Sequence, residues 1–217
     1  MKLSSLSALS LVIRTQSIDC FSGWLAEPLA RYWSAWTTAS WAIWKAGCRT
    51  VATILPLLAN APDANTVLDA IAKDPESAGK QFGHRAGDGQ PWTYLIQGSG
   101  KVLSVDTASR HGLMTVDIGP PASPRQLVLQ IGPVVFGTAL RDALPVISFG
   151  DFVNQIEYAE VSRALNDRAV AMARAGADPA SLAGKMILFA GAATQPAGNS
   201  PVQVTPVSIA PAEGAHS

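Results

Sequence analysis

The chain has little charge and almost no cysteine. Its 217 residues include 16 Lys and Arg against 16 Asp and Glu, so the formal net charge is zero. Nucleic-acid binders usually show a basic face, and this balance therefore argues against a nucleic-acid partner. Cys20 and Cys48 are the two cysteines. Because none follows Cys48, we expect neither a disulfide framework nor a cysteine-based zinc site in the rest of the chain.

Long hydrophobic runs are also missing, since none reaches the roughly 18 residues that a membrane-spanning helix needs. Lys2 followed by the apolar run Leu3–Ile13 has the opening parts of a secretory signal, but no small-x-small cleavage site follows. Ala46-Gly47-Cys48 comes closest to a lipoprotein cleavage box, although Lys45 stands where such a box has leucine. The sequence thus indicates an incomplete export signal.

Tryptophan is in excess near the N-terminus, where all but Trp92 of the six tryptophans precede Lys45. One interpretation is a segment at a lipid–water interface, which tryptophan favours. The other is that the first forty or so residues are not the natural start of the protein. In either case we expect residues 1–41 to pack poorly or to form a lone helix detached from the rest.

A helical segment is predicted next, over 42–73, with an interruption at Pro56. Its second part begins at Pro62-Asp63, carries Val67, Leu68 and Ile71 on one face, and ends before Pro75. The polar, glycine-rich stretch 79–90 that follows is predicted to be a connector. The first two predicted regions of the chain are therefore 1–41 and 42–86.

Alternating polar and apolar residues then predict five strands. The first is long and contains Gly98-Ser99-Gly100, and paired glycines inside a strand usually mark a bulge or a bend. In order, the strands are predicted at Trp92–Asp106, Leu113–Ile118, Arg125–Ile131, Lys185–Ala190 and Val202–Ile209.

Two helices are predicted between the third and fourth strands. Thr138 begins a short one that Pro145 stops, and the capping spacing from Ser148 to Asp151 begins a long helix over Asp151–Ala175. The apolar stripe of the long helix is predicted to contain Phe152, Val153, Ile156, Val161, Ala164, Leu165 and Met172.

This order predicts an α+β fold. We expect an OB-like five-stranded β-barrel over 87–210 with the long helix between strands 3 and 4, preceded by the N-terminal helical segment and followed by a loose tail over 211–217. The bent first strand supports this expectation, because in such a barrel it must pair in both halves. A different small β-sheet with a packed helix is the alternative.

Six polar side chains interleaved with apolar ones are the candidate binding residues. Such groups usually cap backbone or close a loop onto a sheet, and the other interpretation is that they bind a ligand or partner. They are Arg141, Asp142, Asn154, Gln155, Glu157 and Tyr158.

Motifs for catalysis and metal binding are weak. Gly132–Thr138 follows a strand and precedes a helix, like a phosphate loop, but lacks the lysine that would reach a phosphate. His84 and His111 are predicted to lie in solvated loops. No nucleophile is paired with a base in the sequence, so we expect no enzyme, no metal and no cofactor.

Several short sequence segments, taken together, resemble those of one family, the DUF2291 family of predicted periplasmic lipoproteins. They are DPESAGKQFGHR, LIQGSGKVLSVDTASRHG, LVLQIGPVVFGTALRDALP with SFGDF and NQIEYAEV, and LAGKMILFAGA. The resemblance spans about 43–209. It implies a protein of the Gram-negative periplasm, usually held at the membrane by a lipid, with an accessory role beside sugar ABC importers. It implies no catalytic residues, and the missing cleavage box leaves the lipid anchor as an expectation.

The function predicted from the sequence is therefore a non-enzymatic periplasmic binding or accessory lipoprotein. Two alternatives are an OB-fold binder of nucleic acid or oligosaccharide and a hydrolase. The nucleic-acid alternative is weakened because the second and third strands contain no aromatic residue on which bases would stack.

Overall fold

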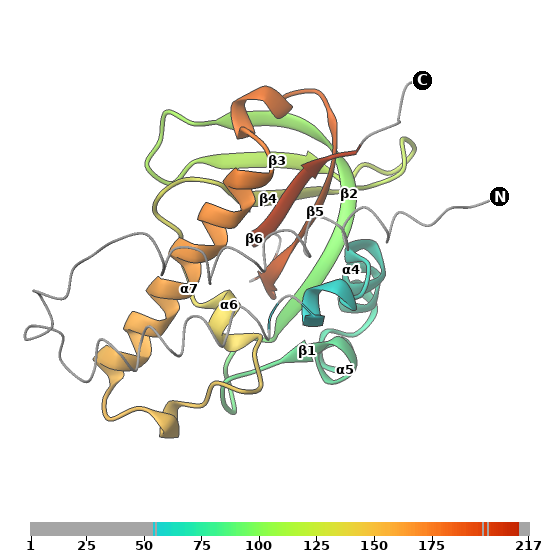
Figure 1. Cartoon of the computed structure of the whole chain (residues 1–217). Helices are drawn as coiled ribbons and strands as arrows, with labels where there is room; N and C mark the ends of the chain where they lie inside the picture. The colour runs from blue at the N-terminus through green and yellow to red at the C-terminus, as the bar shows by residue number, and fades with distance from the viewer. Residues whose placement is uncertain (1–53, 55, 197, 199, 213–217) are drawn as a thin grey trace, which may run out of the picture. The chain divides into compact units, whose positions relative to one another are not determined.

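The computed structural model describes residues 54, 56–196, 198 and 200–212 (Figure 1). The chain divides into two compact units, Met1–Ala59 and Asn60–Ser217. In the first unit the described residues, 54 and 56–59, are helical. The segment 1–41, most of the helix predicted before Leu58, and both cysteines lie outside the described residues, so those expectations stay predictions.

The second unit opens with two helices, of which the sequence predicted one. Helix α4, Ala64–Lys73, begins where Asp63 accepts hydrogen bonds from the backbone N–H groups of the first turn, as predicted. Helix α5, Pro75–Phe82, replaces part of the predicted connector. It forms because Asp74 accepts a 3.1 Å bond from the amide of Glu76 and because proline suits the first helical position.

The strands form a mixed sheet whose pairings close on themselves (Figure 1). The order is β1–β2–β3–β4–β6–β5, and β5 pairs again with β2. Only the β4–β6 pairing is parallel. The strands are β1 (Gly83–His84), β2 (Thr93–Asp106), β3 (Leu113–Asp117), β4 (Gln126–Gln130), β5 (Met186–Thr194) and β6 (Val202–Pro211). Apart from the two-residue β1, they correspond to the five predicted strands.

Strand β2 takes part in both halves of the sheet. Its residues Thr93–Lys101 pair with β5, and Lys101–Asp106 pair with β3. Gly100 lies at this change of partner, where a Cβ atom would come within 2.6 Å of the Asp117 carbonyl oxygen. The predicted bulge lies slightly later than the glycines, because the register of the β2–β3 pairing shifts between Val102 and Ser104.

The core follows the predicted alternation of the strands. Inward side chains of β3 and β4 are fully buried, whereas Leu113 and Gln126 on the outward positions are exposed. Helix α4 adds Ala64 and Val67 to the same core. The buried apolar residues of these two strands and their ends are Met114, Val116, Ile118, Leu127, Leu129 and Ile131.

The long helix begins later than predicted. Helix α6 covers Ala139–Asp142, a 3₁₀ turn covers Phe149–Asp151, and α7 runs from Gln155 to Gly176. The Ser148–Asp151 spacing closes only that turn, through a 3.0 Å bond from the Ser148 amide to Asp151. Asn154 is the residue that caps α7, accepting a 2.9 Å bond from the amide of Glu157. Neither α7 nor any other helix among the described residues is long and apolar enough to cross a bilayer.

The predicted apolar stripe of the long helix is wrong at its start. Val153 and Ile156 are 88% and 74% exposed, and burial begins at Val161 and continues through Leu165 and Met172. The reason is that α7 packs on β6, with Gly176 at its end against the Ile209 carbonyl, while near its start Tyr158 lies against Arg141 of α6 (Figure 1).

This burial pattern predicts that the same substitution at two positions of one helix will have effects of very different size. Leu165→Asp should lower the free energy of unfolding by at least about 3 kcal/mol, because it places an unpaired carboxylate in the core. Ile156→Asp should change it by less than about 0.5 kcal/mol, because the side chain stays in water. Urea unfolding followed by circular dichroism measures both. Equal losses would contradict the packing of α7 described above.

Candidate functional site

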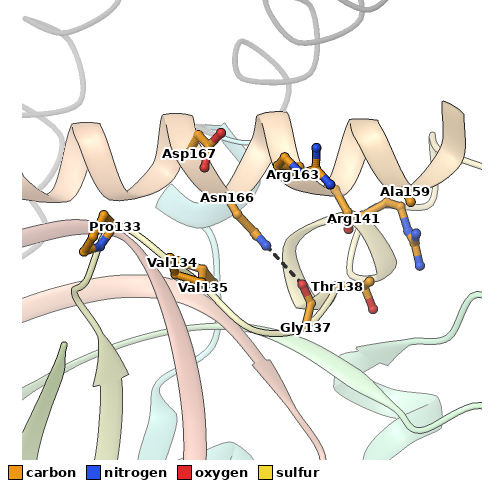
Figure 2. Close-up of a pocket in the computed structure, with 11 residues that line it drawn as sticks. Pro133, Val134, Val135, Gly137, Thr138, Arg141, Ala159, Arg163, Asn166 and Asp167 are labelled. Carbon is orange, nitrogen blue, oxygen red and sulfur yellow. Dashed lines mark hydrogen bonds between the residues drawn. The ribbon is translucent and has the colours of Figure 1, made fainter. Parts of the chain in front are cut away.

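A pocket of about 410 Å³ lies between the loop that follows β4 and the inward side of α7 (Figure 2). The loop supplies an apolar wall, and the helix supplies polar side chains at positions one turn apart. α6 contributes at one end. The lining residues are Pro133, Val134, Val135, Gly137, Thr138, Arg141, Ala159, Ser162, Arg163, Asn166 and Asp167.

Two buried amide side chains hold the loop in place. Gln130 accepts a 2.8 Å bond from the amide of Phe136 and donates a 3.1 Å bond to the carbonyl of the same residue. Asn166 of α7 donates a 3.0 Å bond through Nδ2 to the carbonyl of Gly137, drawn as the dashed line in Figure 2. Gly137 has a φ of 94°, a conformation that a side chain would strain. These hydrogen bonds therefore hold the loop in a defined conformation.

His84 and His111 are more enclosed than predicted. His84 lies in β1, and its Nδ1 is 2.7 Å from the carbonyl of Asp142. The His111 ring is 4.1 Å from the Phe136 ring between centroids, and its buried Nδ1 has no hydrogen-bond partner among the described residues. His111 lies in a turn, as predicted, but is half-buried because Phe136 of the loop after β4 packs on its ring, whereas His84 lies in a strand and not in a loop. Among the described residues, no group of three or more His, Cys, Asp or Glu is arranged to hold a metal ion.

Two residues that line the pocket each have one polar atom that is buried without a hydrogen-bond partner among the described residues. These atoms are Ser162 Oγ and Asn166 Oδ1, and each residue is 6% exposed. The two residues are four apart on α7, so they occupy neighbouring turns of one face. Leaving a polar atom buried and unpaired costs about 1–3 kcal/mol, and such an atom calls for an explanation. Both oxygens are closed off from solvent, so they lie beneath the pocket surface and not on it.

The structure brings three of the six predicted site residues together. The Arg141 guanidinium lies 3.7 Å from the centre of the Tyr158 ring, and its Nη2 is 2.7 Å from Oδ1 of Asp142. Asp142 also accepts a hydrogen bond from the Thr138 hydroxyl. These contacts join α6 to the first turns of α7. Of the three, Arg141 alone lines the pocket.

Burial and charge act in opposite directions on Tyr158. Its removal from water raises the pKa of the phenol above the ordinary value, the Arg141 charge lowers that pKa, and the Asp142 charge raises it. The net direction is upward, so the phenol remains neutral and its ring is available to stack under the guanidinium.

The other three predicted site residues lie at the start of α7 and do not line the pocket. Asn154 caps the helix, and Glu157 accepts a 3.3 Å bond from the amide of Val153. Gln155 is exposed. For Asn154 and Glu157 the structure supplies the backbone-capping role, which was the first of the two interpretations of these residues.

Sequence reasoning missed the residues that make the pocket polar. Ser162 and Asn166 interrupt an otherwise apolar stripe that contains Val161, Leu165 and Ala169. Two polar residues at a four-residue spacing inside an apolar stripe are a signal that could have been read. Nothing in the sequence, however, showed that the Pro133–Thr138 segment would lie opposite them.

Comparison with known proteins gives a family and a fold. The family model described as "Predicted periplasmic lipoprotein (DUF2291)" matches residues 49–210. Among solved structures, an OB-fold protein from Thermotoga maritima superposes with a TM-score of 0.62 at 16% identity, covering 81% of this chain and 99% of that one. At this identity the likeness shows a shared fold and nothing about function. No curated protein matches the chain significantly.

The Arg141 contacts predict a structural role that a substitution can measure. Arg141→Met should lower the free energy of unfolding by about 1–3 kcal/mol, because it removes the stacking on Tyr158 and leaves the largely buried Asp142 without its counter-charge. Arg163→Met is the matched control. Its pairing with Glu160 is solvent-exposed, so the expected change is below about 0.5 kcal/mol. Urea unfolding compares the two, and an unchanged Arg141 variant would contradict the role.

Proposed function

The chain belongs to the DUF2291 family of predicted periplasmic lipoproteins, and from this premise we propose that it is a non-enzymatic binding or accessory module held at the periplasmic face of a membrane. The observation that carries the binding role is the pocket between α7 and the loop after β4. Its lining combines an apolar loop wall with polar side chains from α7, which is the usual composition of a small-molecule site. We propose this pocket as the binding site.

We also infer that strands β2, β3, β4, β6 and β5 form an OB-type five-stranded barrel. In this barrel α7 connects the third strand along the chain, β4, to the fourth, β5. The circuit β2–β3–β4–β6–β5 and the OB-fold neighbour support this inference. We propose that the barrel does not bind nucleic acid, because β3 and β4 contain no aromatic residue for stacking.

For the accessory role we propose a sugar ABC importer component in the same membrane as the partner. An exposed apolar surface supports contact with a second protein. The apolar side chains are those of Val146, Phe149, Val153 and Ile156, which lie just before α7 or in its first turn and are 49–88% exposed. Apolar surface of this kind often marks an interaction site.

Binding of a small polar solute should stabilise the protein and should depend on space in the pocket. At about one hundred times its Kd a ligand adds about 2.7 kcal/mol, or several degrees in Tm for a chain of this size. A thermal-shift screen of mixed polar solutes should find such a stabiliser for the wild type. Ala159→Phe should abolish the shift by filling the pocket.

The control for that screen is Ala171→Phe, since Ala171 is also exposed on α7 but does not line the pocket. It should retain the shift. If no solute stabilises the wild type, or if both variants retain the shift, the pocket is not the binding site.

Contact with an importer should be detectable by site-specific photo-crosslinking in the native host. A photoreactive amino acid at Val153 should give a product in the membrane fraction that contains an importer subunit, whereas the same group at Ala171 should not. Mass spectrometry of the product identifies the subunit. Equal products from both positions, or a protein found only in the cytosol, would refute the accessory role.

A further inference from the structure

We infer that the segment 146–160 docks a basic, amphipathic segment of a partner protein, one that combines apolar side chains with lysine or arginine. This inference rests on the proposed function, because it names the chemistry of the partner that would contact the exposed apolar side chains before and within the first turn of α7. Three features of the 146–160 segment carry it. They are its fixed conformation, the exposure of its apolar side chains and the sign of its charge.

Contacts within the 146–160 segment fix its conformation. The rings of Phe149 and Phe152 each lie 5.4 Å from the Tyr158 ring between centroids. The amide of Val153 donates a 3.3 Å hydrogen bond to the Glu157 carboxylate. These contacts tie the 3₁₀ turn and the residues that precede α7 to the first turns of the helix. The segment is therefore formed before a partner arrives, which lowers the entropy that binding would cost.

Exposed apolar side chains are concentrated in this segment. Among the described residues, four large apolar side chains are more than half exposed, and three of the four are Val146, Val153 and Ile156. The fourth is Phe136, in the loop after β4. Single exposed apolar residues are common on protein surfaces, but a concentration of them marks an interaction site.

The charge of this part of the chain is entirely negative. No Lys, Arg or His occurs between residues 142 and 162. The acidic residues of this stretch are Asp142, Asp151, Glu157 and Glu160. Asp142 and Glu160 are paired with arginines that flank the stretch, at 2.7 and 3.0 Å. Asp151 and Glu157 accept backbone hydrogen bonds, and neither is paired with a cationic side chain among the described residues. Two carboxylates without a counter-charge therefore stand on either side of Val153 in the sequence.

This combination of apolar side chains and negative charge favours a basic protein segment over a lipid bilayer. A membrane surface that contains anionic lipids attracts lysine and arginine and repels carboxylates. Insertion of Val153 into a bilayer would also carry Asp151 and Glu157 toward it, where each would lose hydration and gain no counter-charge. A partner protein can place apolar side chains against Val153 and Ile156 and a cation near each carboxylate, which is the usual form of electrostatic complementarity at an interface.

Fluorescence anisotropy with the full chain tests the chemistry of the partner. The probes are a labelled amphipathic peptide of leucine and lysine and its counterpart of leucine and glutamate. The lysine peptide should bind saturably, and more weakly as salt is added, because salt screens the attraction between exposed charges. The glutamate peptide should not bind. Vesicles of phosphatidylethanolamine and phosphatidylglycerol, sedimented with the protein, measure the membrane alternative.

Charge is tested by the double variant Asp151→Asn, Glu157→Gln. It removes two charges and keeps side-chain oxygens that can accept the backbone hydrogen bonds. Its affinity for the lysine peptide should fall roughly three- to tenfold, as expected for two exposed ion pairs. The matched control is Asp69→Asn, Asp88→Asn, which changes the net charge equally at exposed positions outside the segment and should keep the affinity. Urea unfolding verifies that both double variants are folded.

The apolar contribution is tested by Ile156→Ser. It should weaken binding of the lysine peptide and leave vesicle binding unchanged. Leu103→Ser is the matched control, since Leu103 is a 47% exposed residue of β2, outside the segment. It should leave both unchanged.

The outcomes separate this inference from the proposed function. If the lysine peptide does not bind, binds no better than the glutamate peptide, or loses equal affinity in the two double variants, the basic partner is refuted. The accessory role still stands in that case if the crosslink at Val153 reaches an importer subunit. If Ile156→Ser lowers vesicle binding instead of peptide binding, the segment contacts the membrane and the inference is wrong. If the peptide results are as expected but the crosslinked protein is not an importer subunit, the chemistry of the partner stands and the importer proposal fails.

Discussion

The double pairing of strand β2 is the constraint on which the rest of the structure depends. One strand of 14 residues hydrogen-bonds to β5 along its first part and to β3 along its last part, and this joins the ends of the sheet. The change of partner requires a close approach at Gly100, where the Asp117 carbonyl and the Val116 side chain leave no room for a Cβ atom. Closure satisfies backbone groups that an open sheet would leave at its edges.

Once the sheet is closed, the polypeptide between β4 and β5 must return over its outside. It does so as the loop 132–138, helix α6 and helix α7, with the later turns of α7 packed on β6. The buried amides of Gln130 and Asn166 hold the loop at a fixed distance from the helix. The pocket is the space that remains between them, so its shape depends on the core and not on a mobile segment.

The polar pocket wall has a cost in stability that the fold itself does not require. Ser162 and Asn166 lie on the helix face that otherwise carries the core residues Val161, Leu165 and Ala169. At Ser162 an apolar side chain would avoid the unpaired oxygen and extend the same core, whereas at Asn166 it would lose the hydrogen bond to the Gly137 carbonyl. Family membership and an OB-fold neighbour establish the kind of protein and its architecture, but neither addresses this feature.

The strands and their inward residues could be read from the sequence, because alternation of polar and apolar residues reports directly on a half-buried sheet. The α4 boundaries and the family followed from local signals in the same way. The start of α7 could not be read, since Ser148 and Asn154 are both suitable caps and the choice between them depends on how far the helix reaches beyond the sheet. For the same reason Val153 and Ile156 look like core residues in a helical pattern and are exposed in the fold. The pairing of β2 with two partners, and the meeting of the 133–138 loop with Ser162 and Asn166, were decided by tertiary structure alone, because these contacts join residues far apart in the chain.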